Sequence, residues 1–394
     1  MKRVAVIGGG PAGSTAAERL ARSGLETWLL DEKLAWEKPC GGGVTFKAYQ
    51  QYPFLLSGGA PKRLVSGAVL EAPGERPARL DGLEPICIFA RRDLNQMLLQ
   101  RAAAAGARIL KSRAIGLHRH HTGWRVKTRD GELEVDFVIL ATGARNSFRE
   151  LGTQLRPADT MTALGYYVDG KQEDLEIVFL GDVEGYIWVF PRSDHLSVGI
   201  CGKGLPAQVL RRRLENYMQR KGYEAHPARF YSHLLPCLES PAWRANRIAG
   251  PGWIAAGDAA GFVDPITGEG IYYAIRSGDL AGSLLAADQY SSDQIGLAYS
   301  RLVASDFGED LAFAATLARR FYLGKFLGVQ IPSRTVRFVP RSASFAEILR
   351  DIFAGIQPYR TLKKRLLSRF WIIHKEAIFQ FWWRRLAHLG EEYA

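Results

Sequence analysis

The sequence predicts an α/β fold in which segments of a nucleotide-binding parallel sheet enclose an antiparallel sheet, with a helical region at the C-terminal end. Three observations predict it. A buried strand, Arg3–Ile7, leads through a glycine-rich turn into a helix at about Pro11–Ser23. β-Branched and aromatic residues with polar breaks fill the stretch from Met161 to Cys201, which favours antiparallel strands. From Ser291 onward the apolar pattern is mostly helical.

The other elements follow from the same patterns. Further strands and helices are expected at Thr27–Leu30 (strand), Arg92–Ala105 (helix), Arg108–Val135 (alternating strands), Phe137–Leu140 (strand), Pro206–Lys221 (helix), Trp253–Ala256 (strand) and from near Gly268 (helix). The 394 residues exceed one ordinary core and predict two or three interlocked domains.

Cysteine usage and the N-terminus bear on location. The four cysteines are far apart and form no CxxC pair, so neither a disulfide framework nor a zinc site is indicated and a cytoplasmic protein is expected. The first residues, MKRVAVIGGG, lack the pattern of a signal peptide. No stretch approaches the ~18 uninterrupted apolar residues that a membrane span needs.

Positive charge is concentrated toward the end of the chain. The formal net charge is +12, and residues 331–394 hold 12 Lys or Arg against 5 Asp or Glu. A basic tail favours anionic lipid or an acidic protein as a partner. No recognisable nucleic-acid module accompanies it, so no nucleic acid is expected.

The glycine-rich turn has the spacing of a dinucleotide site. Gly8, Gly10 and Gly13 form GxGxxG between a strand and a helix, where they permit the tight turn, the approach of the pyrophosphate and close helix–strand packing. The helix N-terminus faces the phosphates. Asp31, at the end of the second strand, is the candidate acceptor for the ribose hydroxyls.

Two further segments favour FAD over NAD. Asp258, in the run from Gly257 to Ala260, follows a short strand, and an acid there can hold a ribityl chain. Backbone amides near Gly268 to Ile271 can face the pyrimidine edge of a flavin. Arg91, just before a helix, is well placed for the pyrophosphate. Taken singly, each residue also has a plainer interpretation, as a turn aspartate and a solvated arginine.

The chain resembles group A flavoproteins of the para-hydroxybenzoate hydroxylase type in three blocks: VAVIGGGPAGSTAAERLARSGLETWLLDE, ILATGARNS and GDAAGFVDPITGEGI. Within that superfamily it resembles the geranylgeranyl reductase family in KPCGGGV and GYIWVFP, and the resemblance covers roughly residues 1 to 290. It implies flavin contacts from Gly8, Gly10, Pro11, Ala12, Gly13, Asp31, Glu32, Cys40, Gly41, Gly42, Gly43, Val44, Arg91, Ala141, Thr142, Gly143, Gly257, Asp258, Pro265, Gly268, Gly270 and Ile271.

The resemblance also implies a reaction, the reduction of isolated C=C bonds in prenyl chains. It places Cys40 beside the flavin, as a proton donor, a substrate contact or a small packing residue. It places Tyr186 and Trp188 in the pocket over the flavin, and their alternation with Phe190 puts all three on one strand face. The plainer interpretation of that face is the core side of a sheet.

Three features leave alternatives open. Asn95 and Thr142 stand where relatives of the fold often have Asp, which weakens a monooxygenase or halogenase more than the flavin assignment. A halogenase WxWxIP stretch is partly matched by GYIWVFP, but no catalytic lysine can be assigned. An electron-transfer flavoprotein that passes electrons to quinone is the alternative of another class.

Electrons must reach the flavin without a second nucleotide domain. Only one fingerprint is present, so the donor is NADPH bound transiently, a ferredoxin or a quinol. His118, His120 and His121 lie in a polar strand beside a turn, and no metal is assigned to them.

These inferences divide the chain into three regions. They are a discontinuous FAD-binding domain (1–60, 90–160 and 242–290), a substrate-binding β-sheet domain (61–89 and 161–241) and a helical C-terminal region (291–394).

The C-terminal region has an apolar stripe at helical spacing, made by Leu362, Leu366, Phe370, Ile373, Ala377 and Phe381. Nearby are Trp371, Trp382 and Trp383, and the bases Lys363, Lys364, Arg369, Lys375, Arg384 and Arg385. The stripe either docks on the inner face of a membrane or packs against the flavin domain.

Overall fold

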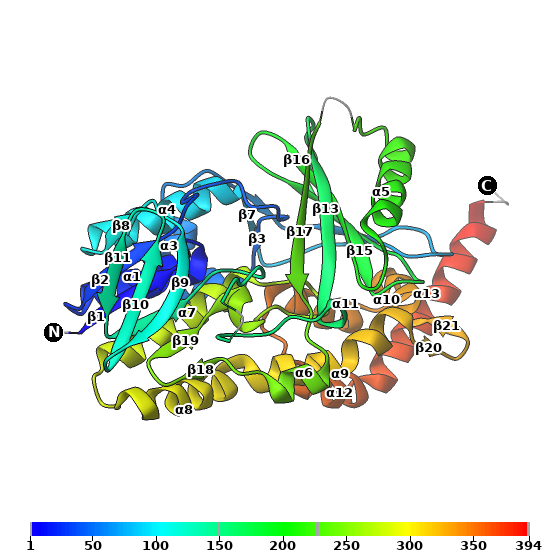
Figure 1. The fold of residues 1–394 in the computed structure, drawn as a ribbon. Coiled ribbons are helices and arrows are strands. Elements are labelled where there is room, and N and C mark those ends of the chain that lie inside the picture. The colour runs from blue at the N-terminus through cyan, green and yellow to red at the C-terminus, as the bar shows by residue number, and fades with distance from the viewer. Residues whose placement is uncertain (1, 149, 226–227, 392–394) are drawn as a thin grey trace.

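A six-stranded sheet forms the nucleotide-binding half of the molecule (Figure 1). The computed structural model describes residues 2–148, 150–225 and 228–391. The strands of this sheet lie in the order β18 (Ala249–Gly250), β19 (Trp253–Ala255), β12 (Phe137–Leu140), β1 (Arg3–Ile7), β2 (Glu26–Leu30) and β8 (Arg108–Leu110). All neighbours are parallel except β18 and β19. The expected Rossmann-type arrangement is confirmed.

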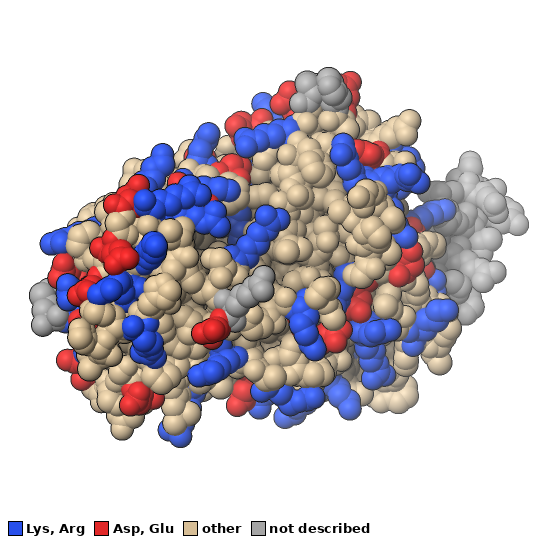
Figure 2. All heavy atoms as spheres, in the orientation of Figure 1, with Lys and Arg blue, Asp and Glu red and all other residues tan. Residues whose placement is uncertain are grey.

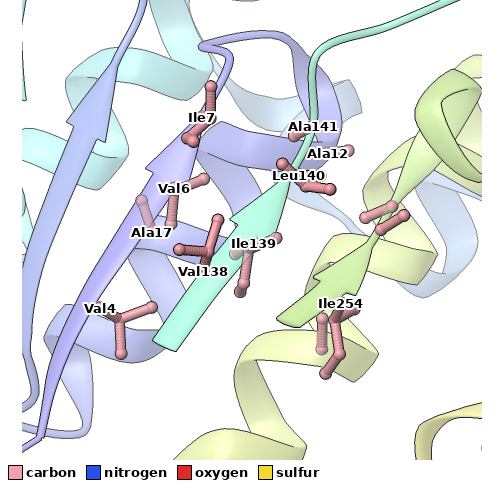
Figure 3. Packing of buried hydrophobic residues seen from close by; sticks show 14 of the residues in the cluster. Val4, Val6, Ile7, Ala12, Ala17, Val138, Ile139, Leu140, Ala141 and Ile254 are labelled. Atoms are coloured by element: carbon pink, nitrogen blue, oxygen red, sulfur yellow. The ribbon is translucent and has the colours of Figure 1, made fainter. Parts of the chain in front are cut away.

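The sheet is buried on both faces, which explains its continuous apolar strands. Val4, Val6, Val138 and Ile254 are completely buried (Figure 3), and each such side chain contributes about 1.5–3 kcal/mol. Helix α1 (Pro11–Arg22) packs on the sheet and against α7 (Ile271–Ala286). The two helices come very close, because a Cβ at Gly278 would lie 2.1 Å from the carbonyl oxygen of Ala12.

A three-stranded antiparallel sheet and helix α4 (Arg91–Ala104) complete this half. Its strands are β9 (Ala114–His120), β10 (Gly123–Thr128) and β11 (Glu132–Val135). The three histidines lie on β9 and the turn after it. Within the described ranges, no group of three or more His, Cys, Asp or Glu side chains is placed to hold a metal ion.

A seven-stranded sheet forms the second half. Its order is β17 (Arg229–Pro236), β13 (Thr160–Val168), β16 (Leu196–Gly202), β15 (Gly185–Pro191), β14 (Leu175–Phe179), β5 (Ala68–Glu71) and β6 (Ala78–Leu80). The expected antiparallel sheet is confirmed, with one parallel pair, β14 with β5, which joins a distant segment to it. Helix α5 (Ala207–Lys221) covers one face of the sheet.

Short elements link the two halves. Helices α2 (Phe46–Gln51) and α3 (Phe54–Ser57) follow the cysteine-glycine turn. Strands β3 (Gly43–Val44), β7 (Ile86–Phe89) and β4 (Lys62–Val65) form a small sheet. Expected element ends differ from the observed ones by three residues or fewer, and helix α7, expected from near Gly268, begins at Ile271.

The C-terminal region is helical, as expected, and in Figure 1 it runs from beneath the nucleotide-binding half, where α8 lies, to the side of the seven-stranded sheet, where α13 lies. Its helices are α8 (Ser292–Val303), α9 (Glu309–Leu323), α10 (Ile331–Phe338), α11 (Ala343–Ala354), α12 (Tyr359–Ser368) and α13 (Phe370–Glu391), preceded by α6 (Ser240–Ala245) and interrupted by the hairpin of β20 (Lys325–Phe326) and β21 (Val329–Gln330). Buried residues of α10 and α11 join the core of the seven-stranded sheet. Across the described residues, no helix is long and apolar enough to cross a membrane.

Most of the apolar stripe on α12 and α13 faces protein. Ile373 is 5% exposed, and the Glu376 carboxylate on the same helix accepts hydrogen bonds from Ser342 and Ser344 at the start of α11. The inner part of the stripe, around Ile373, therefore packs on protein, which is one of the two alternatives that the sequence leaves open. The side chains of Phe381 and of residues 382–385 lie outside those described. Phe370 of the stripe is exposed, and so are four apolar side chains beside it: Leu367, Trp371, Ile372 and Ile378.

Candidate functional site: a flavin cradle beside an apolar cavity

The glycine turn after β1 is shaped by contacts that exclude a side chain. Gly8 has φ +109°, and a Cβ there would lie 2.2 Å from the carbonyl oxygen of Ala141. A Cβ at Gly13 would lie 1.8 Å from the carbonyl oxygen of Gly8. Gly10 differs, because a Cβ there would meet nothing within 4 Å. The turn is closed against its own backbone and open at Gly10, where a pyrophosphate would need room.

Asp31 braces this turn. Its carboxylate accepts hydrogen bonds from the Gly9 amide (2.7 Å) and from the amides of Lys33 (2.7 Å) and Leu34 (2.8 Å). A carboxylate can accept about four hydrogen bonds, so capacity remains for a ribose hydroxyl. Glu32, which the sequence also assigned to the cofactor, is exposed and lies 3.8 Å from the Arg113 and Arg129 guanidinium groups.

Arg91 is buried and incompletely paired. Only 4% of the residue is exposed, one guanidinium nitrogen donates to Asn95 Oδ1 (3.4 Å), and Nε has no partner among the described residues. A buried donor without an acceptor is costly, and a phosphate oxygen would satisfy it. The interpretation of Arg91 as a solvated surface arginine is therefore wrong.

Asp258 lies in a cluster of buried charges. Burial acts to raise its pKa, but the Lys38 ammonium at 2.8 Å outweighs this and the pKa is lowered. His233, on β17, faces the same cluster. Burial, together with the positive charge of Lys38, lowers its pKa to about 3, so the ring is neutral, and its Nε2 has no described partner. The carboxylate is thus ionised and able to accept hydroxyl hydrogen bonds.

The other residues that the sequence assigns to FAD lie in three places. Ala141, Thr142 and Gly143 follow the end of β12, next to the glycine turn. Gly257, Gly268, Gly270 and Ile271 lead into the N-terminus of α7. Val44 and Pro265 are buried and do not line the adjoining cavity, so their side chains contribute packing. The open position at Gly10 and the unsatisfied Arg91 nitrogen both fit the pyrophosphate of FAD.

An apolar cavity of about 430 Å³ adjoins the cradle. Three parts of the chain build its walls: the cysteine-glycine turn and the start of α7, the seven-stranded sheet, and helices α9 to α12. Apolar lining residues include Ile177 and Phe179 from the sheet, and Leu317, Phe321, Leu349 and Phe353 from the helices. The size and lining suit a hydrophobic chain. No motif in the sequence indicates that the C-terminal helices form one wall.

The cysteine-glycine turn reaches the cavity because of its backbone. Gly42 has φ +91°, and a Cβ there would lie 2.0 Å from the carbonyl oxygen of Phe89. The Gly42 amide donates to Cys40 Sγ (3.4 Å), and Cys40, Gly41, Gly42 and Gly43 all line the cavity. Cys40 is half-buried, whereas the other three cysteines are buried.

The alternating aromatic residues of β15 also line the cavity, so Tyr186, Trp188 and Phe190 lie where the pocket interpretation puts them. The Tyr186 hydroxyl donates to the carbonyl oxygen of Thr267 (2.5 Å), and burial holds its pKa well above the usual value. Tyr186 therefore fixes the turn before α7 and stays protonated.

Two buried acids in the cavity escaped the sequence analysis, although both stand in the block GDAAGFVDPITGEGI. Burial raises the pKa of Glu269 to about 7, and it also raises the pKa of Asp264. Asp264 accepts hydrogen bonds from the Ile266 amide (2.8 Å) and from the Tyr359 hydroxyl of α12 (2.8 Å). An acid between two glycines before a helix was the available signal for Glu269.

Known proteins agree with this geometry. Residues 47–278 match the model of the FAD dependent oxidoreductase family. The chain is 32% identical over 305 residues to a digeranylgeranylglycerophospholipid reductase of Methanothermobacter thermautotrophicus, covering 72% of this chain and 77% of that enzyme. The chain belongs to the geranylgeranyl reductase family of FAD-dependent oxidoreductases. The resemblance drawn from its motifs is confirmed, and it is a flavoenzyme.

The chain is also similar to a second reductase and to solved structures. The chain is 31% identical to the chloroplastic geranylgeranyl diphosphate reductase of Nicotiana tabacum over 72% of its own length, and it spans 66% of that enzyme. Among solved structures, a geranylgeranyl bacteriochlorophyll reductase-like protein of Thermoplasma acidophilum has a TM-score of 0.75 at 24% identity, covering 93% of this chain and 98% of that one. A flavin-dependent brominase, Bmp2 in a triple-mutant form, has a TM-score of 0.72 at 16% identity, covering 93% and 98%. Both likenesses show the fold.

Proposed function

We propose that the chain is a reductase that saturates C=C bonds of a polyprenyl chain, or of a similarly hydrophobic substrate. The observation that carries the proposal is the apolar cavity beside the flavin cradle, in a member of this reductase family. A polar or charged substrate would leave the Phe, Leu and Ile walls of that cavity without matching contacts.

The chemistry requires a dry site with a proton donor. An isolated alkene has no carbonyl to stabilise the charge that a hydride would create, so protonation to a tertiary carbocation comes first. FAD in its reduced form, when bound, would supply the hydride that completes the saturation. The apolar walls exclude water, which would otherwise trap the carbocation.

Two residues at the cavity can hold the proton. Cys40 is the first, because its thiol lines the cavity on a turn fixed by Gly42. Glu269 is the second, because a carboxyl with a pKa of about 7 is partly protonated at neutral pH. Tyr186 and Trp188 line the same cavity, and Trp188 is almost fully buried.

The flavin contacts form the second part of the proposal. Gly8, Gly10 and Gly13 with Arg91 would hold the pyrophosphate, Asp31 the ribose and Asp258 the ribityl chain. The open space at Gly10 and the unsatisfied Arg91 nitrogen support this assignment. We also propose that residues 61–89 and 161–241 act as the substrate domain, since β5, β13 and β15 share one sheet.

Membrane contact through α12 and α13 is the proposed route to a lipid substrate. Trp371 is 81% exposed and Leu367 is 62% exposed, while Leu362 on α12 lines the cavity. The basic residues Lys363 and Lys364 are exposed on the same helix and suit anionic lipid. An amphipathic surface connected to the cavity wall would let a prenyl chain enter from a bilayer.

The electron donor is proposed as NADPH, a ferredoxin or a quinol. Lys and Arg side chains are spread over both halves of the face that Figure 2 shows. A basic surface is compatible with an acidic ferredoxin.

Incubating the dithionite-reduced, FAD-loaded protein with a geranylgeranyl lipid under nitrogen tests the proposal. We expect saturated prenyl chains by mass spectrometry, in equal yield without oxygen. A monooxygenase or halogenase of the same fold would be inactive under nitrogen. An electron-transfer flavoprotein would leave the lipid unchanged while reducing a quinone, and either result would contradict the proposal.

A further inference from the structure

Arg192 carries a charge that is completely buried. It follows the last residue of β15, and its side chain is 0% exposed. Nη1 donates to Glu37 Oε1 (2.6 Å), Nη2 donates to the carbonyl oxygen of Cys40 (2.7 Å), and the guanidinium lies 4.8 Å from the ring centre of Tyr167. Its Nε has no hydrogen-bond partner among the described residues, so the two Nη contacts are what hold the buried charge in this position.

Glu37 connects Arg192 to the flavin cradle. Its carboxylate also accepts hydrogen bonds from the amides of Arg91 (3.1 Å) and Arg92 (2.8 Å), at the N-terminus of α4. Burial acts to raise the pKa of Glu37, but the Arg192 charge and these amides outweigh it, so the pKa is lowered and the ion pair persists at neutral pH. One carboxylate therefore joins the cradle to the sheet.

Arg192 lies between β15 and β16, and the carbonyl group of Cys40 has a second donor on β16. Ser197 Oγ lies 3.3 Å from it and 2.9 Å from the Tyr231 hydroxyl. The ring of Phe190 packs on the turn so closely that a Cβ at Gly41 would lie 2.7 Å from it. On its other side the turn is held by the Phe89 amide, which donates to the carbonyl oxygen of Gly42 (2.9 Å).

We propose that Arg192, held by Glu37 and assisted by Ser197, is a positioning residue that fixes the cysteine-glycine turn so that Cys40 faces the cavity. The effect of Arg192 on catalysis rests on the proposed function, whereas its effect on the position of Cys40 does not. Cys40 belongs to the nucleotide-binding half of the chain, whereas Arg192 and Ser197 belong to the sheet. The contact therefore sets where the thiol of one half meets the cavity wall of the other.

The accessibility of the Cys40 thiol measures this positioning directly. Burial raises the pKa of Cys87 to about 11 and of Cys201 and Cys237 to about 12, so these thiols are protonated and unreactive. Alkylation by iodoacetamide in the FAD-loaded protein therefore reports on Cys40, and a Cys40→Ala variant gives the background.

The main test is the double variant Glu37→Gln with Arg192→Met, which removes both charges and leaves no buried carboxylate unpaired. We expect Cys40 alkylation to rise by about tenfold, as loss of a charge-assisted hydrogen bond allows. We expect kcat for prenyl reduction to fall more than KM rises, with FAD retention and flavin reduction unchanged. Arg192→Lys should be intermediate. Arg213→Met, which breaks a surface pair with Asp182, is the matched control and should match wild type.

Alkylation of the double variant at the wild-type rate, with FAD retained, would overturn the inference. If that variant fails to hold FAD, Ser197→Ala decides, because it keeps the ion pair and removes the second donor to Cys40, together with the Ser197 contacts to Tyr231 and Trp188. It should raise alkylation in the same direction by a smaller factor, and an unchanged rate would also overturn the inference. Alkylation needs no substrate, so failure of prenyl reduction in the wild-type protein would contradict the proposed function and leave this test intact.

Discussion

The glycine turn after β1 and the helical wall of the cavity are built in different ways. The turn is determined largely within a few residues, because Gly8 has φ +109° and a Cβ at Gly13 would lie 1.8 Å from the Gly8 carbonyl oxygen. The wall depends on contacts between distant segments, such as the hydrogen bond from Tyr359 to Asp264, 95 residues apart. A local steric rule leaves a motif in the sequence, whereas long-range packing leaves only an apolar pattern. The difference also predicts how each region responds to substitution.

Substitution in the glycine turn should have the largest effect. Gly13→Ala places a methyl group against the Gly8 carbonyl group, at 1.8 Å from its oxygen, so helix α1 must move and FAD should be lost completely. Gly10→Ala should leave the fold intact, because its methyl group meets no protein atom, yet it should also weaken FAD binding. Circular dichroism and the flavin absorbance of purified protein separate these outcomes.

Gly59→Ala is the matched control, since a Cβ there also meets nothing within 4 Å and the position is remote from the turn. It should retain FAD at the wild-type ratio. Full retention by Gly10→Ala would remove the pyrophosphate from this turn.

Cys40→Ala is expected to have the next largest effect. If Cys40 supplies the proton, alkene saturation should slow by ~10²–10⁴, while FAD binding and flavin reduction are kept. Anaerobic single-turnover reduction of a geranylgeranyl lipid measures it, with Cys237→Ala, which does not line the cavity, as control. Turnover equal to that of the control would restrict Cys40 to packing and leave Glu269 as the donor.

Much of the nucleotide-binding half could be predicted from the sequence, since Gly8, Gly13 and the buried strands Arg3–Ile7 and Phe137–Leu140 each follow a local rule. Burial of Arg91 could not, because it depends on how the loop carrying Glu37 folds over α4. The cavity could be predicted only on its β15 side, where alternation identifies one strand face.

The rest of the cavity depends on which distant segments meet. Phe353 and Leu317 lie in helices whose apolar residues are indistinguishable in sequence from ordinary core residues. Glu269 was missed for a related reason, because its raised pKa results from burial by neighbours that the sequence does not specify. The stripe on α13 shows the same limit, since spacing identified an apolar face but not what covers it.

Tyr359→Phe tests whether the helical wall is coupled to the turn before α7. The variant removes one donor from the buried Asp264 carboxyl and should destabilise the protein by about 1–3 kcal/mol. Urea unfolding of the FAD-loaded protein measures the loss, with Tyr290→Phe as control because Tyr290 is 38% exposed. Equal midpoints for the two variants would mean that the wall is attached by apolar packing alone.

The pH dependence of reduction tests Glu269. Its pKa of about 7 is above the usual value, so the carboxyl is protonated below that pH and loses its proton as the pH rises through 7. If its proton is used, the rate should fall by up to about tenfold per pH unit above 7, and Glu269→Gln should abolish that dependence. Because its pKa is raised in the folded protein, the neutral carboxyl contributes to the free energy of unfolding at low pH. This contribution is lost as the pH rises toward 7. Glu173→Gln, at an exposed acid, should keep the wild-type profile.

Membrane contact should be the smallest effect, because it depends on a few exposed groups. Vesicles with anionic lipid should bind the FAD-loaded protein at low salt and release it at high salt, since each surface lysine contributes about 1 kcal/mol and is screened by ions. Lys363→Glu with Lys364→Glu should abolish flotation with the vesicles, and Trp371→Ala should weaken it at both salt concentrations.

Lys171→Glu, at an exposed lysine on the sheet half, is the control for charge alone. Binding that is lost equally in the control would assign it to the general positive charge of the protein. Binding absent from the wild type at low salt would leave α12 and α13 as a wall of the cavity without a docking surface.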